Sequence, residues 1–200
     1  MQSEIRINKH SQFNSEHFPI LSRTKFSDMK RLLLLTFTLS LLTLQSNAQW
    51  SQDLITVPEK TQCTQTSLYA DVMAFIESVD EKSDLVHVES MGKSPEGRDI
   101  PVVVLADPVI TSPEEARASG KPVMYIQGNI HSGEVEGKEI LQILMREILF
   151  GDKKHLLDDQ ILVFAPIYNT DSNDKLGVQE RRSQEGSPEQ TGIRQNSQGW

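Results

Sequence analysis

The sequence has little cysteine, few aromatic residues and no excess of positive charge. The lack of cysteine and of positive charge each excludes a class of protein. Its one cysteine, Cys63, can form neither an internal disulfide nor a cysteine-based zinc site on its own. Aromatic residues make up 6% of the chain. With 37% hydrophobic and 24% charged residues over 200 positions, the composition is that of a globular protein, for which one domain is the first expectation.

The charge is unevenly distributed along the chain. Residues 1–49 carry six Lys or Arg against three Asp or Glu, a net charge of +3. Residues 50–200 carry 14 against 25, a net charge of −11. Nucleic-acid binding needs clustered Lys and Arg to neutralise phosphates, so this acidic body argues against a nucleic-acid partner.

The sequence also lacks a hydrophobic run of the ~20 residues that span a bilayer. Its longest uncharged apolar stretch, residues 32–44 (LLLLTFTLSLLTL), follows Lys30 and Arg31 and precedes Ser46-Asn47-Ala48. A basic start, a short apolar segment and small residues at a cleavage site are typical of a signal peptide, here residues 29–48. A retained membrane helix is the weaker alternative. We therefore expect secretion or export to a periplasm, with no stable membrane insertion after cleavage.

Three segments follow from this assignment. Residues 1–28 are interpreted as a non-native extension upstream of a true start at Met29, and residues 49–200 as the mature body. Within the body, residues 50–66 resemble a linker, and apolar residues at helical spacing predict an amphipathic helix over 67–79, capped by its Ser/Thr-rich approach. Two strands, 85–91 and 100–106, flank the turn-forming residues 92–98 and predict a hairpin.

Residues 123–167 predict a β-α-β unit. A buried strand over 123–127 precedes a helix over 135–150, whose stripe includes Ile140, and a second buried strand over 160–167. Glu139 is expected near the positive end of the helix dipole. The fold class is therefore α/β, with a mixed, mostly parallel sheet flanked by helices. Residues 168–200 are polar and are expected to form an ordered functional loop or a frayed end.

Ligands collect at the carboxyl ends of strands in an open sheet, which directs attention to residues 128–134 (GNIHSGE). His131 and Glu134 lie three residues apart on a tight turn, and an imidazole and a carboxylate are normal Zn²⁺ ligands. Alternatively, Glu134 caps the following helix and His131 is a loop residue. Spacing alone does not separate the two interpretations.

Other polar residues are weaker candidates. His155 follows the crossover helix, which carries the chain to the opposite end of the sheet, so we expect a solvated loop residue. The second strand returns the chain to the His131 end at Asn169 and Asp171. These two residues are expected either to shape a turn or to brace the site.

Four segments together resemble the zinc carboxypeptidases of the carboxypeptidase A type. Residues 92–98 (GKSPEGR) resemble that family's G-K-S-x-E-G-R hairpin, and residues 128–134 its G-x-x-H-x-x-E zinc motif. Residues 168–171 (YNTD) match its N-P-D-G turn with Thr in place of Pro and Ser172 in place of Gly. Residues 194–200 (RQNSQGW) are similar to the R-x-N-x-x-G stretch that leads into a D-x-N-R motif.

The resemblance implies a role for each matched residue. His131 and Glu134 would be two Zn²⁺ ligands, and Arg194 would stabilise the developing oxyanion. Arg181 and Arg182 are rivals for that role, but they lack the Asn and Gly that follow Arg194 in the motif. The fold implied is carboxypeptidase A-like, and the substrate is a peptide or peptide-like molecule.

The resemblance also implies what this chain does not contain. The family takes its third zinc ligand, a His, and its catalytic Glu from downstream of the D-x-N-R motif, whereas this sequence ends at Trp200. We therefore interpret residues 49–200 as the N-terminal part of a zinc carboxypeptidase-like domain, truncated before its last strands, and expect the fragment itself to be inactive. Two alternatives stay open: a zinc amidohydrolase that deacylates small N-acyl amino acids, and a catalytically dead secreted peptide-binding domain.

The signal-peptide assignment predicts that the mature protein begins at Gln49, because Ala48 ends the small-x-small site directly behind the apolar segment. N-terminal sequencing of exported material measures this directly. Recovery of residues 1–28 on the mature protein would contradict both the start at Met29 and the export.

Overall fold

The computed structural model describes residues 50–178 and 190–194, and the predicted signal peptide lies outside these ranges. Four strands form one sheet in the order β1-β2-β4-β3: β1 (Val86–Lys93), β2 (Asp99–Leu105), β4 (Ile161–Ala165) and β3 (Val123–Gln127). The β1–β2 and β2–β4 pairs are antiparallel and the β3–β4 pair is parallel. The mixed sheet is confirmed, but parallel pairing does not predominate among the described strands.

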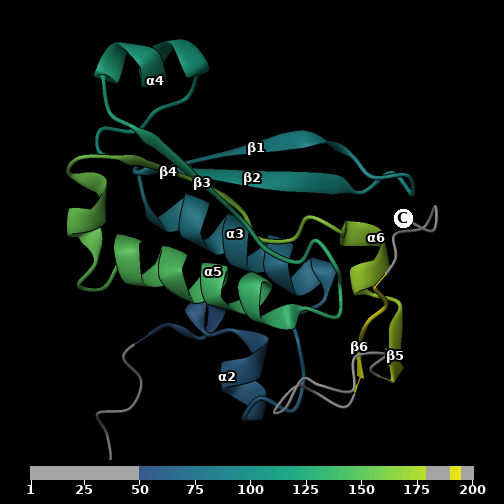
Figure 1. Ribbon diagram of the computed structural model, residues 1–200. Coiled ribbons are helices and arrows are strands. Elements are labelled where there is room, and N and C mark those ends of the chain that lie inside the picture. Colours follow the sequence, from purple (N-terminus) through teal and green to yellow (C-terminus); the bar gives the residue numbers. More distant parts are fainter. Residues whose placement is uncertain (1–49, 179–189, 195–200) are drawn as a thin grey trace, which may run out of the picture. The chain divides into compact units, whose positions relative to one another are not determined.

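Two long helices cover one face of this sheet (Figure 1). They are α3 (Tyr69–Lys82) and α5 (Val135–Leu149), close to the predicted bounds. Successive strand residues point to opposite faces, so Val103, Leu105 and Phe164 are buried beneath the helices. The core that results is a single cluster drawn from both layers: Leu54, Val72, Phe75, Ile76, Val79, Val86, Val103, Leu105, Leu141, Met145, Ile148, Leu157, Leu162, Phe164 and Ile167.

The sequence predicted a linker before α3, and this prediction was wrong. The segment contains the short helices η1 (Gln52–Leu54) and α2 (Val57–Thr61). The Arg146 guanidinium explains why they pack. It donates two hydrogen bonds to the Glu59 carboxylate, at 2.8 and 2.9 Å, and a third to the Leu54 carbonyl oxygen at 2.9 Å. Because Arg146 is only 3% exposed, this ion pair fixes the segment against α5.

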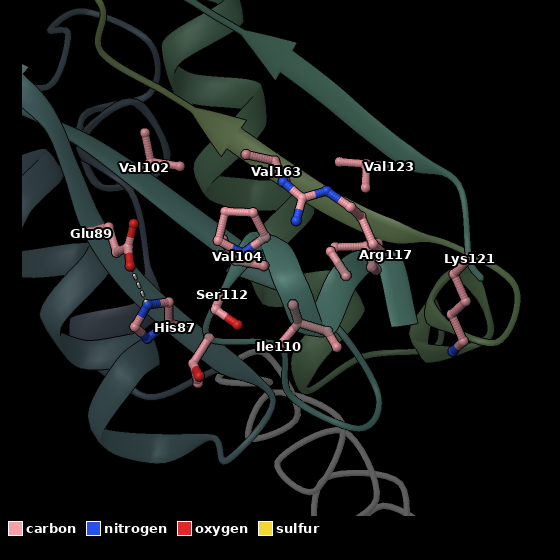
Figure 2. A pocket seen from close by; sticks show the side chains of 14 residues that line it. His87, Glu89, Val102, Val104, Ile110, Ser112, Arg117, Lys121, Val123 and Val163 are labelled. Atoms are coloured by element: carbon pink, nitrogen blue, oxygen red, sulfur yellow. Dashed lines mark hydrogen bonds and ion pairs between the residues drawn. The ribbon is translucent and has the colours of Figure 1, made fainter. Parts of the chain in front are cut away.

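The other face of the sheet is covered only in part, by α4 (Pro113–Ser119), within the described residues. Val102, Val104 and Val163 point to this side and line a cavity of about 490 Å³ beneath Arg117 of α4 (Figure 2). The cavity lies away from the carboxyl ends of β3 and β4. No helix in residues 50–178 and 190–194 is both long and apolar enough to cross a membrane.

Two burial predictions were wrong. Strand β3 was expected to be buried, yet Val123, Met124 and Tyr125 are 54, 50 and 47% exposed because β3 is an edge strand of the described sheet. Ile140 was placed in the buried stripe of α5, yet it is 57% exposed. Lys138 and Gln142 occupy the buried face in its place.

The end of β3 passes α5 at very close range, and the contact leaves no room for a side chain at residue 128. A Cβ atom on Gly128 would lie 2.7 Å from the carbonyl carbon of Gly137 and 2.9 Å from the backbone nitrogen of Lys138. Real Cβ atoms do not approach backbone this closely, so a side chain at residue 128 would push the strand and the helix apart.

We predict that Gly128→Ala lowers the free energy of unfolding by ~1–3 kcal/mol, the usual cost of overpacking. Gly177→Ala is the matched control, because its Cβ would meet only the Ile193 Cγ2 atom at an ordinary 3.7 Å. We expect the control to stay within ~0.5 kcal/mol of the wild type in urea unfolding. Equal stabilities for the two variants would show that the close contact is not a constraint.

Candidate metal centre

The β-α-β unit brings two loops together at the carboxyl ends of β3 and β4, as the sequence predicted. One loop runs from β3 into α5 and carries His131 and Glu134. The other runs from β4 into the one-turn helix α6 (Thr170–Asn173). They border a cavity of about 400 Å³, which is lined by Lys93, Ser94, Pro95, Ile100, Ile130, His131, Tyr168, Asn169, Thr170 and Asp171.

His131 and Glu134 form a close pair in this loop. The Nδ1 atom of His131 lies 3.1 Å from Oε2 of Glu134, and the two side chains are 33 and 30% exposed. The backbone turn that joins them is closed by the Glu134 N–H, which donates to the His131 carbonyl oxygen at 2.9 Å. Each side chain is therefore held, yet accessible to a small ion.

The capping interpretation of Glu134 is not what the structure shows. Glu134 does occupy the N-cap position of α5, but its side chain makes no capping hydrogen bond there. Its carboxylate lies beside the His131 ring instead. An imidazole nitrogen and a carboxylate oxygen side by side are suited in chemistry and spacing to a shared Zn²⁺ ion.

Backbone hydrogen bonds hold the two loops against each other. The N–H of Tyr168 donates to the Gly128 carbonyl at 3.2 Å, and the N–H of Asn169 to the Asn129 carbonyl at 3.0 Å. The Ser132 hydroxyl donates to the Asn169 carbonyl at 3.2 Å. The position of the His131–Glu134 turn thus depends on the position of the loop after β4.

Asn169 and Asp171 divide between them the two roles expected from the sequence, shaping a turn and bracing the site. The Asn169 Oδ1 atom caps α6 by accepting from the Ser172 N–H at 3.3 Å. Asp171 accepts from the Ser94 hydroxyl at 2.6 Å and from the Glu96 N–H at 3.2 Å. Asp171 therefore docks the tip of the β1–β2 hairpin onto α6 and makes the hairpin a wall of the cavity.

Arg98, the last residue of the hairpin motif, strengthens this contact. Its Nη1 atom donates at 2.8 Å both to the Thr170 carbonyl and to Oδ2 of Asp174. Its guanidinium also lies over the Tyr69 ring, 5.2 Å from the centroid. Ser94, Glu96 and Arg98 of the G-K-S-P-E-G-R segment thus hold α6 in place.

Behind α6 lies a buried polar cluster that sequence reasoning missed. Glu139 accepts from the Thr66 hydroxyl, the Ser67 N–H and the Ser67 hydroxyl at 2.6, 2.7 and 2.6 Å. The prediction that the Ser/Thr-rich approach caps α3 was therefore wrong, because Thr66 and Ser67 bond to Glu139. The N–H of Leu68, the N-cap residue, donates instead to the Asp71 carboxylate at 2.8 Å. Lys138 and Gln142 lie on the same face of α5 as the buried Leu141 and Met145. Their helical spacing from these apolar residues could have predicted that they are buried.

Arg194 lies two residues beyond β6 (Gln190–Gly192), which pairs with β5 (Leu176–Val178). This strand packs closely on the site, because a Cβ on Gly192 would lie 2.6 Å from both the Ser132 Cβ and the Ser172 carbonyl oxygen. Arg194 is exposed and is not among the described residues that line the 400 Å³ cavity. Its rivals Arg181 and Arg182 lie outside the described residues.

The remaining histidines of the described body lie elsewhere. His155 is exposed, as predicted, but it lies in the short 3-10 helix η2 (Lys154–Leu157) rather than in a loop, and its ring approaches the Asp152 carbonyl oxygen. His87 pairs with Glu89 at 2.9 Å on β1 (Figure 2). Within residues 50–178 and 190–194, no group of three or more His, Cys, Asp or Glu side chains could hold a metal.

Fold and site together define an α/β protein with a His-x-x-Glu pair at the carboxyl edge of its sheet. The family model described as zinc carboxypeptidase matches residues 72–198, more than half of the chain. The chain belongs to the zinc carboxypeptidase family.

Two relatives illustrate the match. Carboxypeptidase M of Mus musculus is 32% identical over 104 residues, which cover 49% of this chain and 22% of that protein. A crystal structure of a candidate carboxypeptidase A from Shewanella denitrificans OS-217 has a TM-score of 0.50 and 23% identity, covering 66% of this chain and 29% of that one. The fold is thus carboxypeptidase A-like, and the chain spans less than a third of each relative's length.

The buried cluster predicts a pH dependence of stability. Burial lowers the pKa of Lys138 to about 8, against the opposing attraction of Glu139, Asp174 and Asp71. Between pH 8 and the ordinary value of 10.5, the unfolded chain binds the proton that the folded chain has released. Raising the pH therefore stabilises the fold through this group.

We expect the free energy of unfolding to rise by up to ~2 kcal/mol between pH 8 and about pH 9.5, since one unit of pKa is worth ~1.4 kcal/mol. Urea unfolding at fixed ionic strength measures it, and Lys138→Met should abolish the rise. Staying below pH 9.5 avoids Tyr69 and Tyr125, whose pKa values are raised by burial and act in the opposite direction. The same rise in both proteins would contradict the assignment to Lys138.

Proposed function

We propose that this chain is part of an exported zinc metallocarboxypeptidase, which hydrolyses a peptide bond near the carboxyl end of its substrate. The observation that carries the proposal is the His131–Glu134 pair, with its donor atoms 3.1 Å apart and with His131 lining a cavity, in a member of the zinc carboxypeptidase family. The export rests on the basic and apolar residues 29–48.

In this proposal His131 and Glu134 are two protein ligands of Zn²⁺. The bound ion would lower the pKa of a coordinated water and polarise the scissile carbonyl. A catalytic zinc site takes three protein ligands, so the two donors described here need a third from elsewhere in the protein. We expect the 200-residue chain to bind Zn²⁺ weakly and to show no peptidase turnover.

Arg194 is proposed to stabilise the oxyanion that develops on the substrate carbonyl. A guanidinium is always charged and offers paired donors, which suits it to this task. Support comes from its position after β6, whose Gly192 packs against Ser132 in the metal-binding turn. Its exposed side chain is available to a substrate.

The cavity beside His131 gives the substrate a surface to bind. Apolar side chains of Ile100, Ile130 and Tyr168 share its lining with the polar side chains of Asn169 and Thr170. Such a mixture suits a peptide, whose backbone amides need hydrogen-bond partners while its side chains bury apolar surface.

Zinc binding by the 200-residue chain tests the ligand assignment. His131→Ala removes one donor, and Glu134→Gln keeps the shape of the side chain while removing the charge that a divalent cation favours. We expect each to lower Zn²⁺ affinity on the order of tenfold or more in calorimetric titration. His155→Ala, at the opposite end of the sheet, is the matched control and should bind like the wild type.

Circular dichroism and urea unfolding of each variant show whether a loss of affinity is local. Wild-type affinity in both His131→Ala and Glu134→Gln would overturn the metal assignment. A longer protein with the missing donor then decides the reaction: release of carboxyl-terminal residues supports the carboxypeptidase, deacylation of N-acyl amino acids supports the amidohydrolase, and peptide binding without cleavage supports the inactive domain.

A further inference from the structure

Lys138 is a fully buried cation, with 0% of its surface exposed, on the face of α5 that looks toward α6. Its ammonium donates to the Oδ1 atom of Asn173 at 2.7 Å and to the Ser67 carbonyl. Glu139 Oε1 lies 3.6 Å away. A methionine would fill the same space without desolvating a charge, so the lysine is a costly choice for packing alone.

The acceptors of Lys138 belong to segments far apart in sequence. Ser67 precedes α3, and Asn173 ends α6. Asn173 itself donates to the Ser67 carbonyl at 3.1 Å and to Oδ1 of Asp174 at 3.0 Å. The ammonium is therefore the junction at which α5, α6 and the approach to α3 meet.

The helix α6 depends on such contacts because it has only four residues, far fewer than an isolated helix needs to be stable. Arg98 holds it from the hairpin side, through Thr170 and Asp174. Lys138 holds it from the α5 side, through Asn173. Two cations on different elements thus fix one helical turn.

We propose that Lys138 is a positioning residue: its ammonium, acting through Asn173, sets α6 and the preceding Asn169 against the His131–Glu134 turn. The chain of contacts is short. Asn173 donates its N–H to the Asn169 carbonyl at 3.2 Å, and the same carbonyl accepts from the Ser132 hydroxyl inside the turn. The catalytic meaning of this placement rests on the proposed function, but the placement itself does not.

Burial lowers the pKa of Lys138 to about 8, so at pH 7 the side chain is predominantly charged and binds its acceptors strongly. A methionine at this position has no N–H donor and would leave the Ser67 carbonyl and Asn173 Oδ1 without this hydrogen bond. The consequence should be local opening of α6 before the rest of the fold opens.

Amide hydrogen exchange, followed by NMR on the 200-residue chain without metal, tests the proposal. Three amides report on the site: Glu134 (to the His131 carbonyl), Asn169 (to Asn129) and Asn173 (to Asn169). The Ile161 amide, bonded to the Pro122 carbonyl at the other end of the sheet, is the reference. In Lys138→Met we expect the three site amides to exchange at least tenfold faster relative to Ile161 than in the wild type.

Met145→Ala is the matched control, because Met145 is also fully buried on α5 but lies in the apolar core. It should lower the global stability and accelerate the site and reference amides by a common factor. Should Lys138→Met fail to fold, Asn173→Ala removes one acceptor and is expected to give the same local pattern. A uniform acceleration in the lysine variant, or in the asparagine variant used in its place, would overturn the positioning role.

Because this measurement needs no metal, its failure is separate from that of the proposed function. Loss of the zinc assignment in the titrations above would leave the exchange pattern unaffected. Conversely, zinc binding by His131 and Glu134 with uniform exchange would keep the function and reject Lys138 as the residue that positions α6.

Discussion

The backbone contact between Gly128 and Gly137 is the constraint on which the site depends. It brings the end of β3 against the first turn of α5, leaving room for a tight turn that contains His131 and Glu134. A side chain at residue 128 would push the strand and the helix apart and stretch the segment that joins them, which contains the turn. The sheet topology supplies the second requirement, since the parallel pairing of β3 and β4 returns the chain to the same edge.

Further polar contacts connect this turn to the hairpin that forms a wall of the cavity. The loop after β4 is bonded to the loop after β3 through backbone atoms, and α6 is bonded to the hairpin through Asp171 and Arg98. Hydrogen bonds to charged groups contribute roughly 1.5–3 kcal/mol each, more than the neutral ones around them. Much of the order at this edge therefore comes from side-chain charge, in a part of the molecule with little apolar core.

The sequence was sufficient for the β-α-β unit and for the His131 turn, because both depend on local periodicity and strand order. It was insufficient where a long-range partner decides. Strand β3 has an apolar sequence but lies at the edge of the described sheet. Glu139 looked like a charge beside the helix dipole, whereas Thr66 and Ser67, more than 70 residues away, take it into the interior.

The polar segment before α3 is a second case in which a long-range partner decides the structure and the sequence prediction was wrong. Its composition resembles a linker, yet the buried Arg146 of α5 donates a hydrogen bond to the Leu54 carbonyl oxygen and forms an ion pair with Glu59. Burial by itself raises the pKa of Glu59, but the hydrogen bonds from Arg146 and Thr56 outweigh it and hold the pKa below its ordinary value. Periodicity over a few residues contains no information about a partner 87 residues away.

The His131–Glu134 pair is already ordered before any metal binds, and this order affects the free energy of metal binding. Its two donor atoms already lie 3.1 Å apart, and the backbone turn that joins them is closed by its own hydrogen bond. The entropy cost of bringing the donors together is thus met in folding, and binding would not have to supply it. Glu134→Gln keeps this turn and an acceptor oxygen but removes the negative charge. The variant therefore separates the attraction of a cation from the architecture of the loop.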